Sequence, residues 1–158
     1  MDNGKKGVTI IALGIVLIVM GLLVGLGGIG ISDLVEETQV KEFASELQQL
    51  EYLSENYLIR NNGRADFEVY ELSTAYLSDE FIEQLSEERI VENKIMLHTL
   101  ELDKIDAMDT NYGQQKEGAD DIYLLSEETG NVYYKLGIKY KDVTYYTLTD
   151  ELKDILEN

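Results

Sequence analysis

The 158-residue chain contains no cysteine, no tryptophan and no proline, and it has a single histidine. Without cysteine it has neither a disulfide framework nor a thiol nucleophile, and a zinc site would need carboxylates beside the one imidazole. Basic residues are also scarce, because 13 Lys and Arg stand against 31 Asp and Glu, for a net charge of -18. Such a chain repels phosphates, which excludes direct binding of nucleic acid. Its length predicts one small domain with a modest core.

Charge is absent from one long stretch near the N-terminus, residues 8–31. About 20 apolar residues cross a bilayer as a helix, so this run predicts a single transmembrane helix. Lys5 and Lys6 precede the run and acidic residues follow it, which places residues 1–7 in the cytoplasm and residues 62–158 outside the cell. A cleaved secretory signal peptide is the alternative, although its apolar stretch is usually only about 7–15 residues.

Glycines recur within the apolar run at positions 14, 21 and 25. Gly21 and Gly25 are four residues apart, and Gly14 precedes Gly21 by seven, a spacing that lets two helices approach closely in lipid. We therefore expect Gly14, Gly21 and Gly25 to pack against other membrane helices. The alternative is that these glycines have no packing role and reflect only the ordinary tolerance of glycine in membrane helices.

The boundary before the apolar run reads Lys5-Lys6-Gly7-Val8-Thr9, a short basic leader that ends in glycine. This boundary resembles the N-terminus of type IV prepilins and pseudopilins, in particular Gram-positive, clostridial-type members. The resemblance implies that a prepilin peptidase cuts after Gly7 and methylates the new N-terminus at Val8. It also implies that the freed helix leaves the bilayer and packs with the helices of other pilin-like subunits.

One residue departs from the family pattern. Most members carry a glutamate at the fifth position after the cut, where this chain has Ala12. In the family that glutamate pairs the subunit with the N-terminal amine of its neighbour. The departure favours a minor or atypical subunit over a major pilin.

Residues 32–61 follow the apolar run with an amphipathic helical pattern. The apolar face of this pattern consists of Val40, Phe43, Leu47, Leu50 and Tyr57. The sequence Asn61-Asn62-Gly63 predicts the end of the helix. Residues 8–61 would then form one long helix, with a membrane half and an amphipathic half, as in the pilin family.

The sequence of residues 65–110 predicts one short helix and one strand. Ser78 precedes acidic residues and an apolar pattern through Ile90, which predicts a short helix with a serine cap. Residues 94–102 predict a strand with alternate side chains on one side. Those side chains are Met96, His98, Leu100 and Leu102.

The last part of the chain predicts a three-stranded antiparallel meander over residues 121–125, 132–138 and 143–148. Turn residues at 126–131 and at Lys141-Asp142 separate these strands. A terminal helix capped by Thr149 follows, with three apolar side chains directed inward. These are Leu152, Ile155 and Leu156. The expected fold class is α+β, with a long N-terminal helix packed on a small antiparallel meander, and the resemblance makes this pilin-like.

Few residues indicate chemistry. His98 has no nucleophile motif to serve, so a packed or surface histidine is expected, and we predict no enzyme and no cofactor. Two groups of residues offer oxygen ligands for calcium, but neither has the alternating spacing of an EF-hand. This favours a solvated acidic surface and no metal site. The groups are Asp103, Asp106, Asp109, Asn111 and Gly113, and Asp120, Asp121 and Glu127.

Two tyrosine pairs, Tyr133-Tyr134 and Tyr145-Tyr146, lie in the expected meander. Strand alternation predicts that one ring of each pair enters the core. The outer rings would then form an adhesive patch or simply fill the edge of the sheet.

Two functions follow from these observations. The first is a minor pilin or pseudopilin subunit of a type IV-like pilus, or of a pseudopilus for secretion or DNA uptake, processed by a prepilin peptidase and displayed in a surface filament. The second is a single-pass membrane protein whose extracellular domain binds or senses a ligand and never polymerises. The two differ in whether residues 1–7 are removed.

Overall fold

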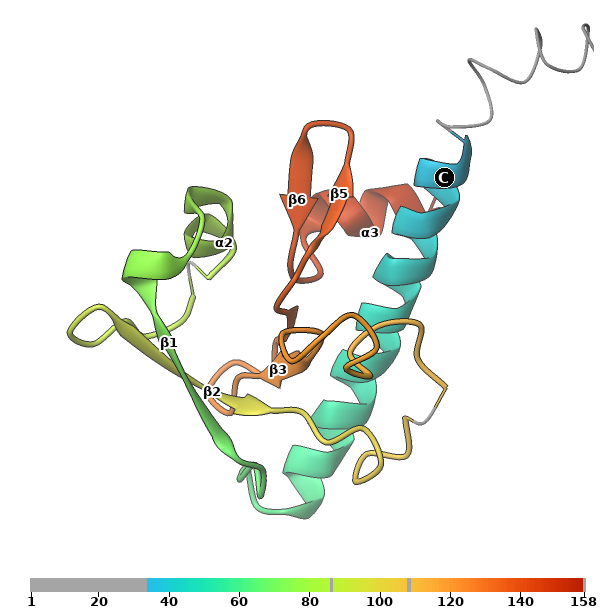
Figure 1. Ribbon diagram of the computed structural model, residues 1–158. Helices are drawn as coiled ribbons and strands as arrows, with labels where there is room; N and C mark the ends of the chain where they lie inside the picture. The colour runs from blue at the N-terminus through green and yellow to red at the C-terminus, as the bar shows by residue number, and fades with distance from the viewer. Residues whose placement is uncertain (1–33, 86, 108, 158) are drawn as a thin grey trace, which may run out of the picture. The chain divides into compact units, whose positions relative to one another are not determined.

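The computed structural model describes residues 34–85, 87–107 and 109–157. The chain divides into two compact units, Met1–Glu37 and Thr38–Asn158. The description that follows concerns the second unit, together with residues 34–37, the described part of the first. Residues 34–60 are helical, and nine further elements follow along the chain (Figure 1). They are β1 (Val69–Ser73), η1 (Thr74–Tyr76), α2 (Asp79–Gln84), β2 (Lys94–Thr99), β3 (Tyr123–Leu125), β4 (Val132–Tyr134), β5 (Ile138–Tyr140), β6 (Val143–Tyr145) and α3 (Asp150–Glu157).

The helix of residues 34–60 confirms the amphipathic pattern predicted from the sequence. Four of the five predicted face residues are almost completely buried, and Tyr57 packs against the same core while staying partly exposed. The helix ends where Asn61-Asn62-Gly63 predicts. Gly63 N–H donates to the Leu58 carbonyl at 2.7 Å, and Asn62 adopts a φ of 57°. This is the Schellman arrangement, in which a residue in the left-handed region lets the last carbonyls be satisfied.

The main sheet has four antiparallel strands in the order β1-β2-β3-β4. One of its faces packs against the helix of residues 34–60 through side chains of β3 and β4. These side chains are Tyr123, Leu125, Val132 and Tyr134. The opposite face packs under α2, whose Phe81 inserts beside Leu85 into a second core. The sheet is therefore a middle layer with a separate apolar core on each face.

The second core draws on strands across the sheet. Its sheet residues are Leu72, Ile95, Leu97, Leu124 and Tyr133. The prediction that Met96 and His98 share one side of a strand is confirmed by the pairing of β2. The buried positions, however, are the intervening Ile95 and Leu97, while Met96 is 56% exposed. The strand also stops at Thr99, before the predicted end at residue 102.

The predicted three-stranded meander is wrong. β4 ends at Tyr134, and β5 begins only at Ile138 as part of a separate two-stranded sheet with β6. A turn interrupts the expected strand, because Gly137 N–H donates to the Tyr134 carbonyl at 3.1 Å and Gly137 has a φ of +68°. That conformation is one glycine adopts at little cost, and it redirects the chain out of the main sheet.

Both helix caps agree with the sequence. Ser78 Oγ accepts the Phe81 N–H at 3.1 Å, and Thr149 Oγ1 accepts the Leu152 N–H at 3.3 Å. Leu152 is fully buried, with Ile155 and Leu156 packed against the same core. The helix after Ser78 is shorter than predicted, since it ends at Gln84. The expectation that its pattern runs through residue 90 is wrong. The Leu85 N–H donates to the carbonyls of Phe81 and Ile82, and the Glu88 N–H then donates to the Leu85 carbonyl at 2.8 Å in a turn that ends the helix.

The described part of the chain contains no helix that is both long and apolar enough to cross a bilayer. The predicted transmembrane segment, residues 8–31, and the leader, residues 1–7, lie outside the described residues.

Candidate functional site

The residues predicted for processing and helix packing all lie outside the described part of the chain. They are Lys5, Lys6, Gly7, Val8 and Thr9 for processing, and Gly14, Gly21 and Gly25 for packing. Their roles stay predictions. Within the described residues, two features stand out: carboxylates that hold the domain together from inside, and an open groove over the uncovered part of the sheet.

Glu46 joins the helix of residues 34–60 to the loop that precedes β3. Its carboxylate accepts the Tyr123 hydroxyl at 2.6 Å and the backbone N–H groups of Asn111 and Tyr112 at 2.8 and 3.2 Å. Burial raises the pKa of the Tyr123 hydroxyl, and the hydrogen bond to Glu46 adds to that rise. The phenol therefore remains a proton donor, and the buried carboxylate has three partners.

Asp121 organises the same loop from its other end. Burial alone would raise the pKa of its carboxyl group, but hydrogen bonds from the N–H groups of Glu117 and Gly113 and from the Tyr134 hydroxyl outweigh burial, and the pKa is lowered. The Gly113 N–H lies 2.7 Å and the Tyr134 hydroxyl 3.0 Å from Oδ1. Asp121 is thus committed to holding the loop.

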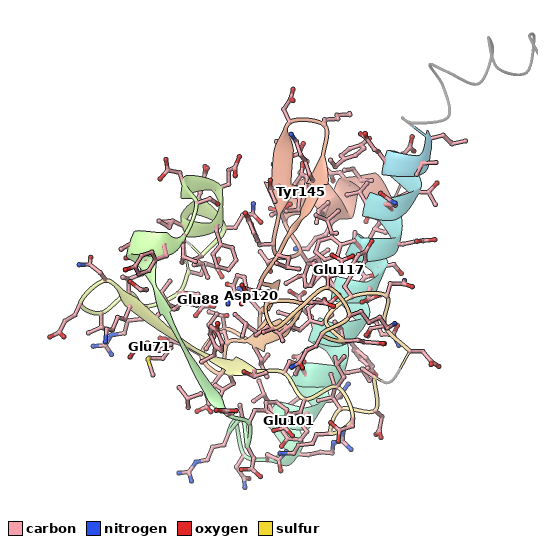
Figure 2. All side chains as sticks on the ribbon, in the orientation of Figure 1. Glu71, Glu88, Glu101, Glu117, Asp120 and Tyr145 are labelled. Carbon is pink, nitrogen blue, oxygen red and sulfur yellow. The ribbon has the colours of Figure 1, made fainter. Side chains whose placement is uncertain are left out.

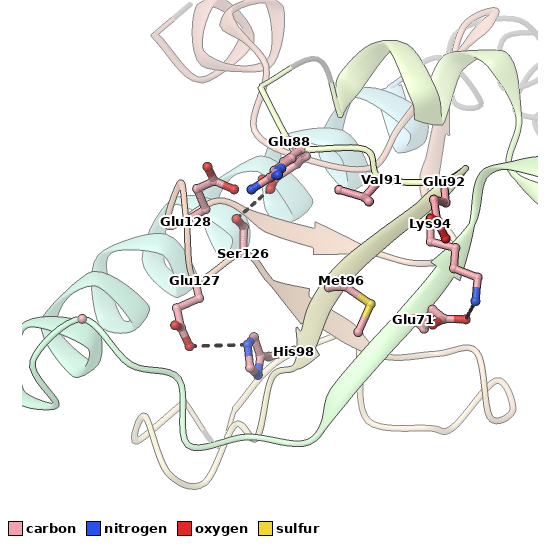
Figure 3. Close-up of a pocket in the computed structure, with 12 residues that line it drawn as sticks. Glu71, Glu88, Val91, Glu92, Lys94, Met96, His98, Ser126, Glu127 and Glu128 are labelled. Atoms are coloured by element: carbon pink, nitrogen blue, oxygen red, sulfur yellow. Dashed lines mark hydrogen bonds and ion pairs between the residues drawn. The ribbon is translucent and has the colours of Figure 1, made fainter.

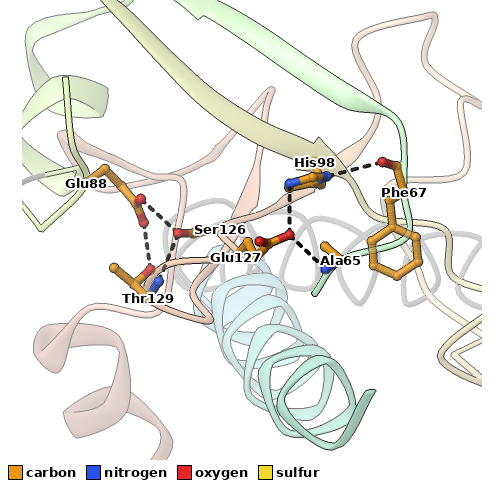
Figure 4. A network of polar contacts seen from close by, with 7 residues as sticks. All are labelled: Ala65, Phe67, Glu88, His98, Ser126, Glu127 and Thr129. Carbon is orange, nitrogen blue, oxygen red and sulfur yellow. Dashed lines mark hydrogen bonds and ion pairs between the residues drawn. The ribbon is translucent and has the colours of Figure 1, made fainter. Parts of the chain in front are cut away.

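Glu88 forms a third buried centre, on the α2 side of the sheet. It accepts the hydroxyl groups of Ser126 at 2.8 Å and Thr129 at 2.7 Å (Figure 4). It also accepts the Tyr133 hydroxyl at 2.9 Å. The turn between β3 and β4 is therefore attached to the segment that follows α2. No single sequence pattern signals this contact, because Glu88 is about 40 residues before its partners, which lie within residues 126–133.

Glu51 lies on the helix of residues 34–60, opposite the start of β4. Desolvation by burial raises its pKa from 4.5 to about 6, while the N–H of Val132, 3.5 Å from Oε1, and the charge of Lys153 oppose the rise. A carboxyl group whose pKa is higher in the folded state stabilises the fold below its unfolded pKa. That contribution is lost as the pH rises through about 6.

Replacing Glu51 with glutamine is expected to stabilise the domain by about 1 kcal/mol at about pH 8, because the amide keeps the acceptor oxygen and removes the buried charge. Near pH 4, where the carboxyl group is neutral, the gain should vanish. Urea unfolding of the full chain in detergent, followed by near-UV circular dichroism of the tyrosines, measures both values. Glu55→Gln, an exposed site one turn later, is the control, and an equal gain at both pH values would refute the assignment.

The open groove lies where the helix of residues 34–60 leaves the sheet uncovered. The core under this helix includes side chains of β3 and β4 but none from β1 or β2. On that face β1 and β2 present Val69 and Met96, which are 52% and 56% exposed. A cavity of about 590 Å³ lies here (Figure 3).

We call this cavity the β2 groove. Its floor consists of Glu71, Lys94, Met96 and His98. One wall is formed by Glu88, Arg89, Val91 and Glu92, and the other by Ser126, Glu127 and Glu128. Glu71 and Glu88, both labelled in Figure 2, come from β1 and from the segment after α2. Topology alone brings these segments together, so the sequence carries no local signal for the groove.

His98 lies at one end of the β2 groove. Its Nδ1 is 3.2 Å from the Phe67 carbonyl and its Nε2 is 3.4 Å from Glu127, which also accepts the Ala65 N–H at 2.8 Å (Figure 4). The imidazole bridges the chain before β1 to the turn after β3. Of the two expected arrangements, a packed or a surface histidine, the structure shows the packed one.

The second group of candidate calcium ligands has other partners. Asp121 holds the loop before β3, Glu127 contacts His98 and Ala65, and Asp120 pairs with Lys135. Across residues 34–85, 87–107 and 109–157, no group of three or more His, Asp or Glu side chains is placed to hold a metal ion.

The expectation that one ring of each tyrosine pair faces outward is wrong for the first pair. Tyr133 and Tyr134 are both fully buried, because each face of the sheet has its own core. In the second pair Tyr145 is buried, and Tyr146 packs edge-to-face on Phe81, with ring centroids 4.4 Å apart. Neither pair therefore offers an exposed aromatic patch.

Comparison of the chain with protein-family models, with curated proteins and with solved structures finds no significant match.

Proposed function

We propose that the protein is a minor pilin or pseudopilin subunit of a type IV-like pilus, or of a pseudopilus for secretion or DNA uptake. The observation that carries the proposal is the sequence Lys5-Lys6-Gly7 directly before the uncharged residues 8–31. In this proposal a prepilin peptidase removes residues 1–7 and methylates Val8. Residues 8–31 then move from the lipid bilayer into a bundle of equivalent helices.

The described domain supports this proposal at the level of architecture. Residues 34–60 form a helix whose apolar face packs on an antiparallel sheet, which is the α+β arrangement that the resemblance implies. Over residues 38–60 the helix buries one face only, since Tyr52 and Ile59 are each more than 60% exposed. In the proposed filament these two side chains would contact neighbouring subunits.

Ala12, in place of the family's glutamate, supports a minor subunit. Without that carboxylate the chain lacks the partner for a neighbour's N-terminal amine. A subunit of this kind joins a filament built largely by other pilin-like chains. The protein before assembly would be a single-pass membrane protein with its domain outside the cell.

Processing provides the direct test. Co-expression of the full chain with a prepilin peptidase should remove residues 1–7 and add a methyl group at Val8, as mass analysis of the purified protein would show. Gly7→Ala should largely abolish this change, because a side chain at that position blocks close approach of the peptidase to the backbone.

Gly4→Ala is the matched control, since Gly4 lies in the same leader but away from the cut. Its product should match that of the unaltered chain. An intact Met1 in the native protein, or equal processing of both variants, would contradict the proposal. The remaining function would then be the membrane-anchored binding or sensing module that does not polymerise.

A further inference from the structure

The β2 groove is a part of the sheet that the chain itself leaves uncovered. The face under α2 is closed across strands of the whole sheet, whereas the opposite face is closed only over β3 and β4. Within the groove Met96 on the floor is 56% exposed and Val91 on the wall is 50% exposed, and charged residues surround both. Apolar side chains within a polar rim are typical of a surface that another polypeptide covers.

We propose that the β2 groove binds an extended, lysine- or arginine-rich segment of a partner protein. The groove is lined by the carboxylates of Glu71, Glu88, Glu92, Glu127 and Glu128, against the basic side chains of Arg89 and Lys94. This excess of negative charge selects a cationic occupant. The proposal does not depend on filament assembly.

The contacts within the groove show which carboxylates remain for a partner. Glu71 pairs with Lys94 at 2.9 Å, and Glu127 contacts His98. Glu92 and Glu128 are exposed, and neither forms an ion pair with a basic residue in the described part of the chain. They lie on the two walls, so a basic segment between them meets a carboxylate on each side.

Other occupants fit the charge less well. A second copy of this chain carries a net charge of -18 and would bring its own carboxylates to the groove. Nucleic acid and anionic lipid are repelled for the same reason. The floor is a strand with Lys94 at one end and His98 at the other, about 13 Å apart at the usual rise per residue. An extended segment that runs along β2 places alternate side chains toward Met96 and the walls.

Fluorescence anisotropy of a labelled short peptide that alternates Lys and Val tests this proposal, with the full chain held in a zwitterionic detergent. Binding is expected, and it should be lost at about 1 M NaCl, where the Debye length falls to about 3 Å. The double variant Glu92→Lys with Glu128→Lys should weaken binding by about fivefold to tenfold, because each reversal replaces an attraction with a repulsion. A peptide that alternates Glu and Val should not bind.

The matched control is the double variant Glu83→Lys with Glu157→Lys, which makes the same change in net charge at exposed positions outside the groove. It should bind the Lys/Val peptide within about twofold of the unaltered chain. Equal loss in both double variants would overturn the proposal, because general charge attraction would then explain the binding. Light scattering that shows self-association of the chain, abolished by the groove variant alone, would also overturn it in favour of a second copy.

Discussion

Replacing Gly113 with alanine is expected to lower the free energy of unfolding by about 3–4 kcal/mol. Gly113 has a φ of +71°, and a Cβ placed there would lie 2.2 Å from Cδ2 and 2.6 Å from Cε2 of the Tyr123 ring. The left-handed backbone costs an L-residue about 1–2 kcal/mol. Overpacking against a fixed side chain costs about 1–3 kcal/mol more.

The Tyr123 ring has no room to move away from that Cβ. Only 1% of Tyr123 is exposed, its hydroxyl donates to Glu46 at 2.6 Å, and its ring packs against Tyr134 with centroids 5.3 Å apart. The backbone of Gly113 is equally constrained, because its N–H donates to Asp121. Relief of the clash must therefore break one of these contacts.

Gly63→Ala separates the two costs. Gly63 has a similar φ of +77°, yet a Cβ built there meets no atom within 4 Å. Its replacement should cost only the backbone term, about 1–2 kcal/mol. Urea unfolding of the full chain in detergent, followed by near-UV circular dichroism, compares the two variants. A loss at Gly113 no larger than that at Gly63 would show that the loop before β3 yields more easily than its contacts indicate.

The sequence predicts the parts of the fold that rest on local signals. The helix of residues 34–60, its end at Asn62 and Gly63, and the caps at Ser78 and Thr149 all depend on residues within a few positions of one another. The turn at Lys141-Asp142 is local in the same way, and Lys141 has a φ of 54°. Such patterns retain their meaning whatever surrounds them.

The errors arise where tertiary structure decides. Alternation along β2 is visible in the sequence, but which side is buried depends on α2 and on how far the long helix extends over the sheet. The run Tyr133-Tyr134 resembles a half-buried strand, although both faces of β4 are covered. Gly137 is a single residue within the predicted strand of residues 132–138, and only its positive φ reveals the break.

The candidate sites divide in the same manner. The processing motif around Gly7 is contiguous, so the sequence suffices to propose it. The β2 groove joins Glu71, Met96 and Glu128, which are brought together only by the order of the strands. The carboxylate contacts are equally remote in sequence, since Glu46 and Tyr123 are 77 residues apart. The composition of an acidic chain therefore does not indicate which of its carboxylates form structural contacts.

Glu46→Ala is expected to destabilise the domain by about 3 kcal/mol, because it leaves the buried Tyr123 hydroxyl and the N–H groups of Asn111 and Tyr112 without their acceptor. Glu42→Ala, at an exposed position one turn earlier on the same helix, should change stability by no more than about 0.5 kcal/mol. The same urea unfolding experiment measures both variants.

A double-mutant cycle with Tyr123→Phe isolates the contact between the two side chains. Loss of the hydroxyl alone should cost about 1 kcal/mol, because two backbone donors still satisfy the carboxylate. In the double variant the cost should fall short of the sum of the single costs, since the hydroxyl is no longer buried without an acceptor. Additive costs would mean that Glu46 acts through the loop backbone alone. A loss of stability for Glu46→Ala as small as that for Glu42→Ala would mean that Asp121 holds the loop before β3 from its other end.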